Sequence, residues 1–440
     1  MAYVVGLLVL LVGLLASIAL HEIGHMVPAK KFGVRVSRYM VGFGPTLWST
    51  TKGETEYGLK AFPLGGYVKL VGMFPPAEAV GAPPRRGRVA ELVQAAREQS
   101  AEEILPGEDH RAFYRLSTPK KVVVMLGGPV MNLVIAAVLF TVILVGFGVP
   151  GALTTTVGVV GDCVLPPDAA PNRTCTAADP KAPAAAAGLQ PGDKLISFGG
   201  TPISSWADFT KAVKSSAGGT VPLVVERTGK STTLQVTPVM IERPVLDDHG
   251  KRVVGADGKP TTHLARYVGL SPTQMREHKP LSSVAGVLGQ NVWQTAAIVA
   301  TLPGRLVDVA RATFGSSQRD ASSVVGVVGV GRFAGEIASA NLPGYDMSER
   351  VSDMLGLVAV LNIALFVFNL IPLLPLDGGH VAGALWEGAR RQVARLRGMP
   401  RPAPADVARM MPLAYGVFLV LAVMGVFLVY ADIVKPVRLG

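Results

Sequence analysis

The chain has 440 residues, of which 49 % are hydrophobic and 17 % are charged, fewer charged residues than the roughly 25 % of soluble domains. This apolar content excludes an intrinsically disordered protein, and two cysteines are too few for a disulfide-rich scaffold or a four-cysteine zinc site. The net charge of +11 is compatible with an anionic partner such as nucleic acid. Whether it indicates such a partner depends on where in the chain the charged residues lie.

Four apolar runs contain no charged residue: 3–20, 122–149, 354–376 and 410–431, with 18, 28, 23 and 22 residues. A helix needs roughly 20 apolar residues to cross about 30 Å of hydrocarbon, so each run is long enough to span a membrane. We therefore predict a polytopic α-helical membrane protein with four transmembrane helices.

The basic residues orient these helices. Segment 26–121 carries 15 Lys and Arg against 9 Asp and Glu, segment 378–410 carries 6 against 2, and segment 150–353 is nearly balanced at 19 against 17. By the positive-inside rule, 26–121 and 378–410 are cytoplasmic, while the N-terminus and 150–353 are outside. The positive charge thus reports topology, and we expect no nucleic-acid partner.

The first cytoplasmic segment begins with strand-like pieces over 34–73, separated by glycine and proline, which predict a small antiparallel sheet. A flexible insert and a short helix follow. In the outer segment, strands around one or two short helices predict a compact α+β or partly open barrel domain between about 155 and 237. Cys163 and Cys175 lie in this domain and form either a local disulfide or two free thiols.

A further uncharged stretch of 25 residues lies between Lys279 and Arg305. It contains Gln290, Asn291 and Gln294, which are costly to place in lipid. A fifth span here would also invert the helix that follows. We therefore expect a helix on the membrane surface.

The sequence His21-Glu22-Ile23-Gly24-His25 closes the first apolar run. Residues four apart share a helix face, so both imidazoles can point at one metal ion, with Glu22 beside them. A catalytic zinc ion takes three protein ligands, and a neighbouring carboxylate can accept a proton from water. The pattern therefore indicates a zinc hydrolase site, and the alternative is a pair of interfacial histidines.

Asp377 is the candidate third ligand, because it is the only acidic residue at the end of the third apolar run. Two prolines and two glycines around it loosen the helix, although Asp377 can also be an N-cap of the next segment. With four spans, Asp377 and the histidine pair lie at the same membrane edge. With five spans they would lie about a bilayer apart.

These motifs resemble those of the bacterial site-2 proteases, which are intramembrane zinc metalloproteases. The resemblance rests on the HEIGH sequence, on Gly127-Gly-Pro-Val-Met-Asn132 in the second run, and on Asn369-Leu-Ile-Pro and Leu-Asp377-Gly in the third. It implies that His21, His25 and Asp377 bind Zn²⁺ and that Glu22 is the general base and then the acid. It also implies that Asn132 and Asn369 handle substrate or support the active site, although interhelical hydrogen bonds explain both asparagines equally well.

The resemblance extends to the two extramembrane parts. Residues 186–200, with Trp206, resemble a PDZ domain, which would exclude bulky substrates or bind a new C-terminus. The 34–73 sheet resembles a membrane-reentrant β-loop that presents an extended substrate strand. The implied substrates are single-span membrane proteins, such as anti-sigma factors after a first cut, in the bilayer of the bacterial cytoplasmic membrane.

The resulting domain plan has nine parts. They are a first span (1–33), a β-sheet (34–74), a cytoplasmic insert (75–121), a second span (122–150), a PDZ-like domain (151–241), an outer linker with a surface helix (242–353), a third span (354–377), a cytoplasmic loop (378–409) and a fourth span (410–431).

Two other functions are compatible with parts of the sequence. One is a non-catalytic PDZ membrane scaffold with a structural or vestigial zinc site, but a structural site has no need of Glu22. The other is an ion or metal transporter, but the ionisable groups gather at one membrane edge and the sequence shows no inverted repeats.

Overall fold

The computed structural model describes residues 1–81, 87–166, 173–245, 261–315, 319, 323–341 and 345–437. The chain forms two compact units. The membrane unit comprises Met1–Gly146, Pro280–Ser339 and Arg350–Leu439, and the β unit comprises Phe147–Lys279 with Ala340–Glu349. Each unit has a hydrophobic core of its own.

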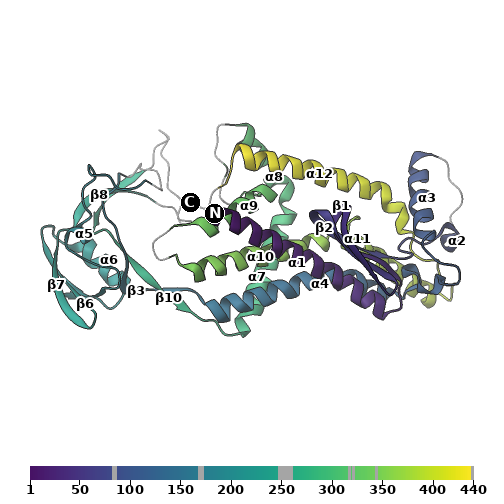
Figure 1. Ribbon diagram of the computed structural model, residues 1–440, viewed down its shortest axis with the longest axis horizontal. Helices are drawn as coiled ribbons and strands as arrows, with labels where there is room; N and C mark the ends of the chain where they lie inside the picture. Colours follow the sequence, from purple (N-terminus) through teal and green to yellow (C-terminus); the bar gives the residue numbers. More distant parts are fainter. Residues whose placement is uncertain are drawn as a thin grey trace. The chain divides into compact units, whose positions relative to one another are not determined.

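Within the described residues, four helices are long and apolar enough to cross a membrane (Figure 1). They are α1 (Ala2–Lys31), α4 (Thr118–Thr141, continued by a π-helical turn over Val142–Phe147), α10 (Met347–Asn369) and α12 (Met411–Val434, preceded by a 3-10 turn over Val407–Met410). Only 17 to 33 % of the apolar stretch of each helix is buried in the protein alone, as expected for surfaces that face lipid. The chain is a multi-pass membrane protein.

The third span differs from its predicted limits of 354–377. Helix α10 begins at Met347 and ends at Asn369, because Pro372 and Pro375 follow and cannot continue a helix. Asp377 therefore does not end this span. It opens α11 (Asp377–Leu396), which occupies most of the predicted loop 378–409.

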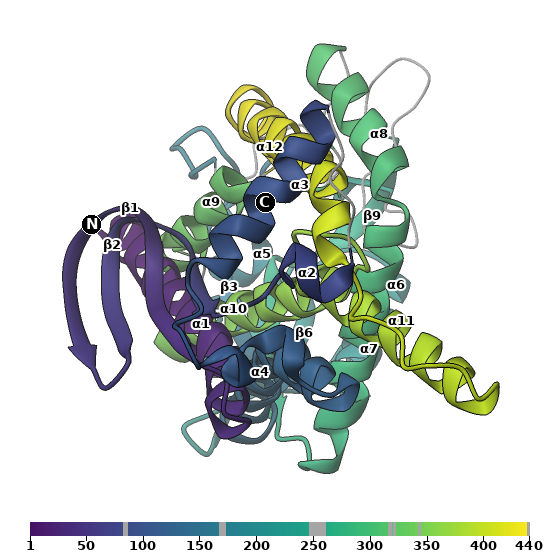
Figure 2. The same ribbon diagram turned by 90° about the vertical axis from the view of Figure 1, so that its right-hand side faces the viewer.

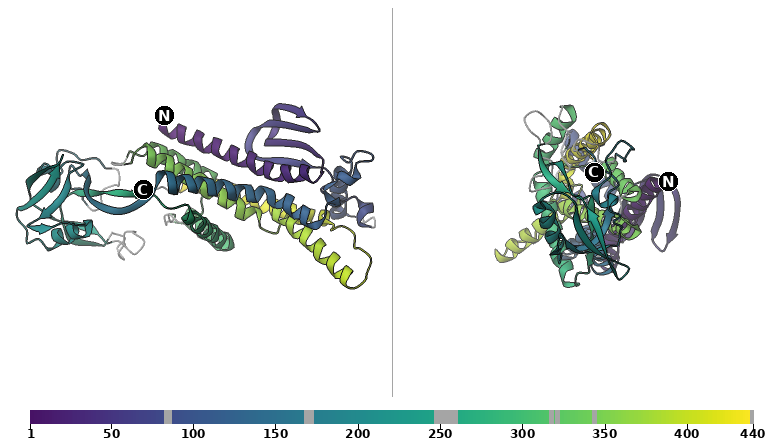
Figure 3. Two further views of the ribbon diagram at one scale, coloured as in Figure 1. Left: turned by 90° about the horizontal axis from the view of Figure 1, so that it is seen from below. Right: turned by 90° about the vertical axis from the view of Figure 1, so that its left-hand side faces the viewer.

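A β-sheet lies along one side of α1 (Figure 3). It consists of two long antiparallel strands, β1 (Val36–Lys52) and β2 (Thr55–Leu70). Both strands bend back on themselves, so that Tyr39 pairs with Tyr57 on one side and with Val68 on the other. The segment 66–70 is therefore an edge of this sheet. The insert that follows contains α2 (Ala77–Val80), α3 (Arg88–Ala101) and two 3-10 turns (Asp109–Arg111 and Phe113–Arg115).

The predicted linker 242–353 contains more structure than the one expected helix. A helix is present where one was predicted, α7 (Ser282–Ala300), but α8 (Leu302–Phe314) and α9 (Val327–Ser339) follow it. Helix α9 packs closely against α1, where Gly6 leaves no room for a side chain: a Cβ there would lie 2.3 Å from the carbonyl oxygen of Ala334. Its tertiary contacts, more than its local sequence, stabilise this short helix.

The β unit is built on a six-stranded sheet with the order β10-β3-β4-β6-β7, in which the short β5 pairs with β4. Its strands are β3 (Val149–Val160), β4 (Lys194–Phe198), β5 (Thr201–Pro202), β6 (Val221–Arg227), β7 (Lys230–Val236) and β10 (Leu270–Glu277). A separate hairpin, β8 (Val239–Pro244) and β9 (Thr262–Tyr267), and two helices, α5 (Pro183–Ala186) and α6 (Trp206–Ser215), complete it.

The predicted domain 151–241 is therefore too short. Strand β3 pairs along its length with β10, so the sheet is completed only at Glu277. The two paired strands are more than 100 residues apart in the chain. The sequence of β10 is short and polar, so it does not predict a strand that pairs with β3.

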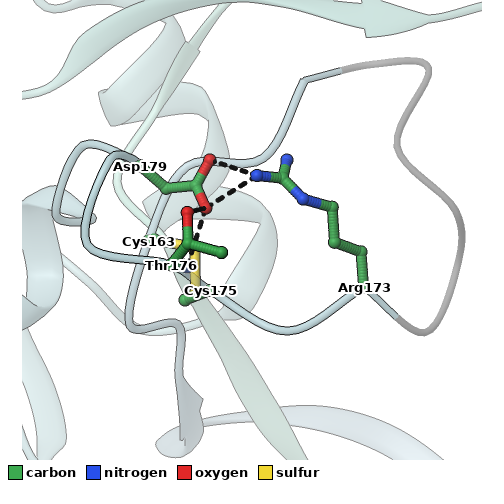
Figure 4. Close-up of a disulfide and its surroundings, with 5 residues drawn as sticks. All are labelled: Cys163, Arg173, Cys175, Thr176 and Asp179. Atoms are coloured by element: carbon green, nitrogen blue, oxygen red, sulfur yellow. Dashed lines mark hydrogen bonds and ion pairs between the residues drawn. A yellow bond between two sulfur atoms is a disulfide. The ribbon is translucent and has the colours of Figure 1, made fainter.

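Cys163 and Cys175 form a disulfide in the loop between β3 and α5 (Figure 4). Beside it, Nη2 of Arg173 donates hydrogen bonds to both carboxylate oxygens of Asp179. Oδ2 of Asp179 also accepts from the backbone N–H and the hydroxyl of Thr176. Of the two alternatives open for these cysteines, the structure contains the disulfide.

Candidate metal centre

The HEIGH sequence lies in the last part of α1. Its three ionisable residues, His21, Glu22 and His25, line the same cavity. His25 is 4 % exposed and Glu22 is 9 % exposed. Both are expensive to bury in an apolar helix bundle unless they have partners, so their burial marks a functional site. Asp377, the first residue of α11, lies opposite them.

One ligand atom from each of His21, His25 and Asp377 meets at a single point. The two Nε2 atoms are 3.2 Å apart, and Oδ2 of Asp377 lies 3.4 Å from His21 Nε2 and 3.3 Å from His25 Nε2. Three ligands about 2.0–2.1 Å from a tetrahedral zinc ion would be roughly 3.3 Å apart. The three distances therefore fit Zn²⁺, and within the described residues this is the one such group of His, Cys, Asp or Glu.

Residues of helix α4 contact the Nδ1 atoms of both imidazole rings, on the side away from the ligand atoms Nε2. Nδ1 of His25 lies 2.8 Å from the carbonyl oxygen of Val124, to which it can only donate, so the lone pair of this ring is on Nε2. Nδ1 of His21 lies 3.1 Å from the amide nitrogen of Asn132. The Oδ1 atom of Asn132 is buried without a partner. Rotating this amide by 180° would let Oδ1 accept from His21 Nδ1–H and would free the lone pair of Nε2.

Glycines bring α1 and α4 close enough for these contacts. A Cβ on Gly24 would lie 2.3 Å from the carbonyl oxygen of Gly127, and a Cβ on Gly127 would lie 1.9 Å from that of Gly24. A Cβ on Gly128 would lie 2.2 Å from Nε2 of His25. The glycine pair of the second apolar run therefore makes room for the imidazole rings.

The three ligand atoms face a cavity of about 400 Å³. One wall is the sheet edge from Gly65 to Val68, and another is formed by Asn132 and by Asn369, the last residue of α10. The structure thus gathers all six predicted site residues around one cavity: His21, Glu22, His25, Asn132, Asn369 and Asp377.

One polar contact near the site has no counterpart among the sequence predictions. Asn362 of α10 is fully buried, and its Nδ2 donates to Oγ of Ser17, one turn before His21 on α1. From the sequence alone, one asparagine and one serine in two separate apolar runs cannot be predicted to form a hydrogen bond with each other. His380, the other histidine near this span, lies outside the metal-ligand group and packs against the ring of Phe74.

Comparison with known proteins agrees with this geometry. The sequence profile of peptidase family M50 matches residues 9–401. The chain is 35 % identical to the zinc metalloprotease Rip1 of Mycobacterium tuberculosis and 33 % identical to Rip1 of Mycolicibacterium smegmatis, in both cases over the whole of both chains. It is 26 % identical to the metalloprotease MmpA of Caulobacter vibrioides over 89 % of each chain. The chain therefore belongs to peptidase family M50, the site-2 protease family, and is a zinc metalloprotease.

Proposed function

We propose that this protease cuts a peptide bond within or near the transmembrane segment of single-span membrane proteins. The observation that carries the proposal is the position of the convergent ligand atoms, which face a cavity lined by span helices and by the sheet edge. A site at this depth suits a substrate that is itself embedded in the membrane.

His21, His25 and Asp377 are the proposed zinc ligands. When bound, zinc supplies Lewis acidity and makes water a better nucleophile near neutral pH. The carbonyl oxygen of Val124 holds the ring of His25 in the ligating tautomer. With its amide rotated by 180°, Asn132 would do the same for His21 through its Oδ1 atom. Of the two roles predicted for Asn132, this contact favours support of the active site over substrate handling.

Glu22 is the proposed general base. It lies on the helix turn between the two histidines, is nearly buried and lines the cavity. Its carboxylate would take the proton of the attacking water and then deliver it to the leaving amine. Asn369 lines the same cavity from α10, where its amide can donate a hydrogen bond to a substrate carbonyl.

The sheet edge supports the unwinding of a helical substrate. The carbonyl groups of a transmembrane helix are engaged in hydrogen bonds, so a helix must open before one of them is attacked. An opened segment would leave backbone groups unpaired at a depth with little water. The edge at 66–68, which borders the cavity, would provide partners by strand addition.

The finer assignments follow from the sequence. The positive-inside rule places the active site near the cytoplasmic edge of a bacterial cytoplasmic membrane and the β unit outside. The β unit is proposed to be a PDZ-like domain that excludes bulky substrates or binds a new C-terminus. Anti-sigma factors trimmed by a first protease are the proposed substrates.

The test is cleavage of a single-span substrate by the purified protein in detergent. We expect cleavage that a chelator stops and zinc restores. Glu22→Gln should keep bound zinc and the fold but lose cleavage by about 10²–10⁴-fold, the usual contribution of a general base. His21→Ala should lose bound zinc as well. Full activity of Glu22→Gln would remove Glu22 from the mechanism, and cleavage only of soluble peptides would contradict the intramembrane substrate.

A further inference from the structure

Helix α11 has two opposite faces of different chemistry. One face is buried and includes Ala384, Glu387 and Ala394, and Glu387 on this face contacts α4. The other face carries an apolar stripe at helical spacing, made of Leu385, Trp386, Ala389, Val393 and Leu396. Leu385, Trp386, Val393 and Leu396 are 56, 64, 44 and 76 % exposed. We call these five residues the α11 stripe.

The orientation of the α11 stripe is fixed by a buried ion pair. Nζ of Lys121 on α4 lies 2.9 Å from both carboxylate oxygens of Glu387, and Nη1 of Arg391 lies 2.8 Å from one of them. Gly388 is close enough to α4 that a Cβ there would lie 2.8 Å from the side chain of Thr118. Because this polar face is held against α4, the α11 stripe points away from the bundle.

The same contacts hold α11 against the N-terminal, basic end of the span helix α4. Glu387 lies level with the first turns of α4, where the apolar span meets Lys120 and Lys121. Seven residues separate the end of the span α10 at Asn369 from the start of α11 at Asp377. The 3-10 turn that precedes α12 begins at Val407, eleven residues after α11 ends at Leu396. Figures 2 and 3 show the C-terminal part of α11 extending away from the other helices of the membrane unit.

The charges beside the stripe fit an anionic surface. Arg390 and Arg397 border it on one side, and both are exposed. Segment 378–410 carries six arginines and two acidic residues, and the acidic residues, Glu387 and Asp406, are already engaged in ion pairs. A basic helix with an exposed apolar stripe that includes Trp is the pattern of a helix lying in a lipid headgroup layer.

We propose that the α11 stripe lies in the headgroup layer of the bilayer that the spans cross, with Arg390 and Arg397 on anionic lipid phosphates. The ring of Trp386 then sits at the depth that tryptophan prefers at membrane interfaces. Since Asp377 is the first residue of α11, this contact would couple the lipid surface to the placement of the third proposed zinc ligand.

The test uses spin labels in the full-length protein in nanodiscs of phosphatidylcholine with or without phosphatidylglycerol. The two native cysteines are paired, so labels go to Val393→Cys and Leu396→Cys on the stripe and to Arg395→Cys off it. We expect the stripe labels to collide with oxygen more often, and with a water-soluble nickel complex less often, than the Arg395 label. The contrast should increase with phosphatidylglycerol.

Charge variants complete the test. Arg390→Gln and Arg397→Gln should each weaken the phosphatidylglycerol dependence by about fivefold, the factor for one basic residue at an anionic surface. Arg391→Gln, which removes an arginine from the buried face, is the control and should leave that dependence unchanged. Equal access of the nickel complex to all three labels in both lipids would overturn the proposal. Protection of the stripe labels from both reagents would also overturn it, because that result indicates a protein partner or a second copy of the chain.

Discussion

Gly128 of the second span leaves no room for a side chain beside the proposed zinc ligands. A Cβ at this position would lie 2.2 Å from Nε2 of His25 and 2.7 Å from Cε1 of His21, so both rings would have to move. We predict that Gly128→Ala lowers zinc affinity by at least the roughly 10- to 100-fold that disturbed ligand orientation costs. Metal analysis of the purified variant measures this.

Gly146→Ala is the matched control for this substitution, because a Cβ at Gly146 would meet no atom within 4 Å. It should bind zinc like the unchanged protein. Normal zinc binding by Gly128→Ala would show that the rings have room the structure does not give them.

Substitutions of Asn132 test which tautomer His21 adopts. If its Oδ1 accepts from His21 Nδ1–H, then Asn132→Asp preserves the acceptor and should keep or strengthen zinc binding, as in other carboxylate–histidine–zinc arrangements. Asn132→Leu removes the acceptor and should weaken zinc binding by about 10- to 100-fold. Competition with a zinc chelator gives both affinities. Weak binding by the aspartate variant would mean that Asn132 donates to His21.

At the scale of elements, Asp432 of α12 acts as a cap for a helix more than 100 residues away. Its Oδ2 accepts from the backbone N–H groups of Gly326 and Gly329, each at 2.8 Å, at the start of α9. Its Oδ1 accepts from Nη1 of Arg319 at 2.9 Å, and the side chains of both residues are buried. This carboxylate therefore ties the last span to the helix that packs on α1.

We predict that Asp432→Asn destabilises the protein by about 3 kcal/mol, because it leaves the buried Arg319 charge without its partner. Asp308→Asn is the matched control, since Asp308 is exposed, and it should change stability by no more than about 0.5 kcal/mol. Thermal unfolding in detergent compares the two. Equal midpoints would show that Arg319 is neutralised in another way.

The same elements show what the sequence can predict. The four spans are predictable because a run of about 18 or more apolar residues is rare outside membrane helices, and the HEIGH spacing forces two imidazoles onto one helix face. Helix α9 is not predictable in this way, because Arg332 and Glu336 interrupt its apolar pattern and its cap lies on α12. The end of the third span is predicted too late because apolar character continues past Asn369 through the two prolines.

At the scale of the whole molecule, the two compact units have separate cores and should unfold in separate transitions. The β unit contains the buried carboxylate of Asp193, which accepts hydrogen bonds from Nε and Nη2 of Arg227 at 2.7 Å each. This guanidinium holds the pKa of the Asp193 carboxyl below its usual range. In the unfolded chain the pKa of an aspartate is about 3.9.

The sign of the pH effect follows from that difference. A group whose pKa is lowered by folding stabilises the folded state fully above its unfolded pKa, and the stabilisation is lost as pH falls from about 4 through the lower folded value. We therefore predict that acid lowers the unfolding midpoint of the β unit in this window. Asp193→Asn should lower the midpoint at neutral pH and flatten its acid dependence. The acid dependence that remains would come from Asp208 and Asp179, whose pKa values are lowered by hydrogen bonds from Ser204 and Ser205 and from Thr176, respectively. Calorimetry of the full-length protein between pH 6 and pH 3 measures both effects, and an unchanged acid dependence in Asp193→Asn would assign it to other groups.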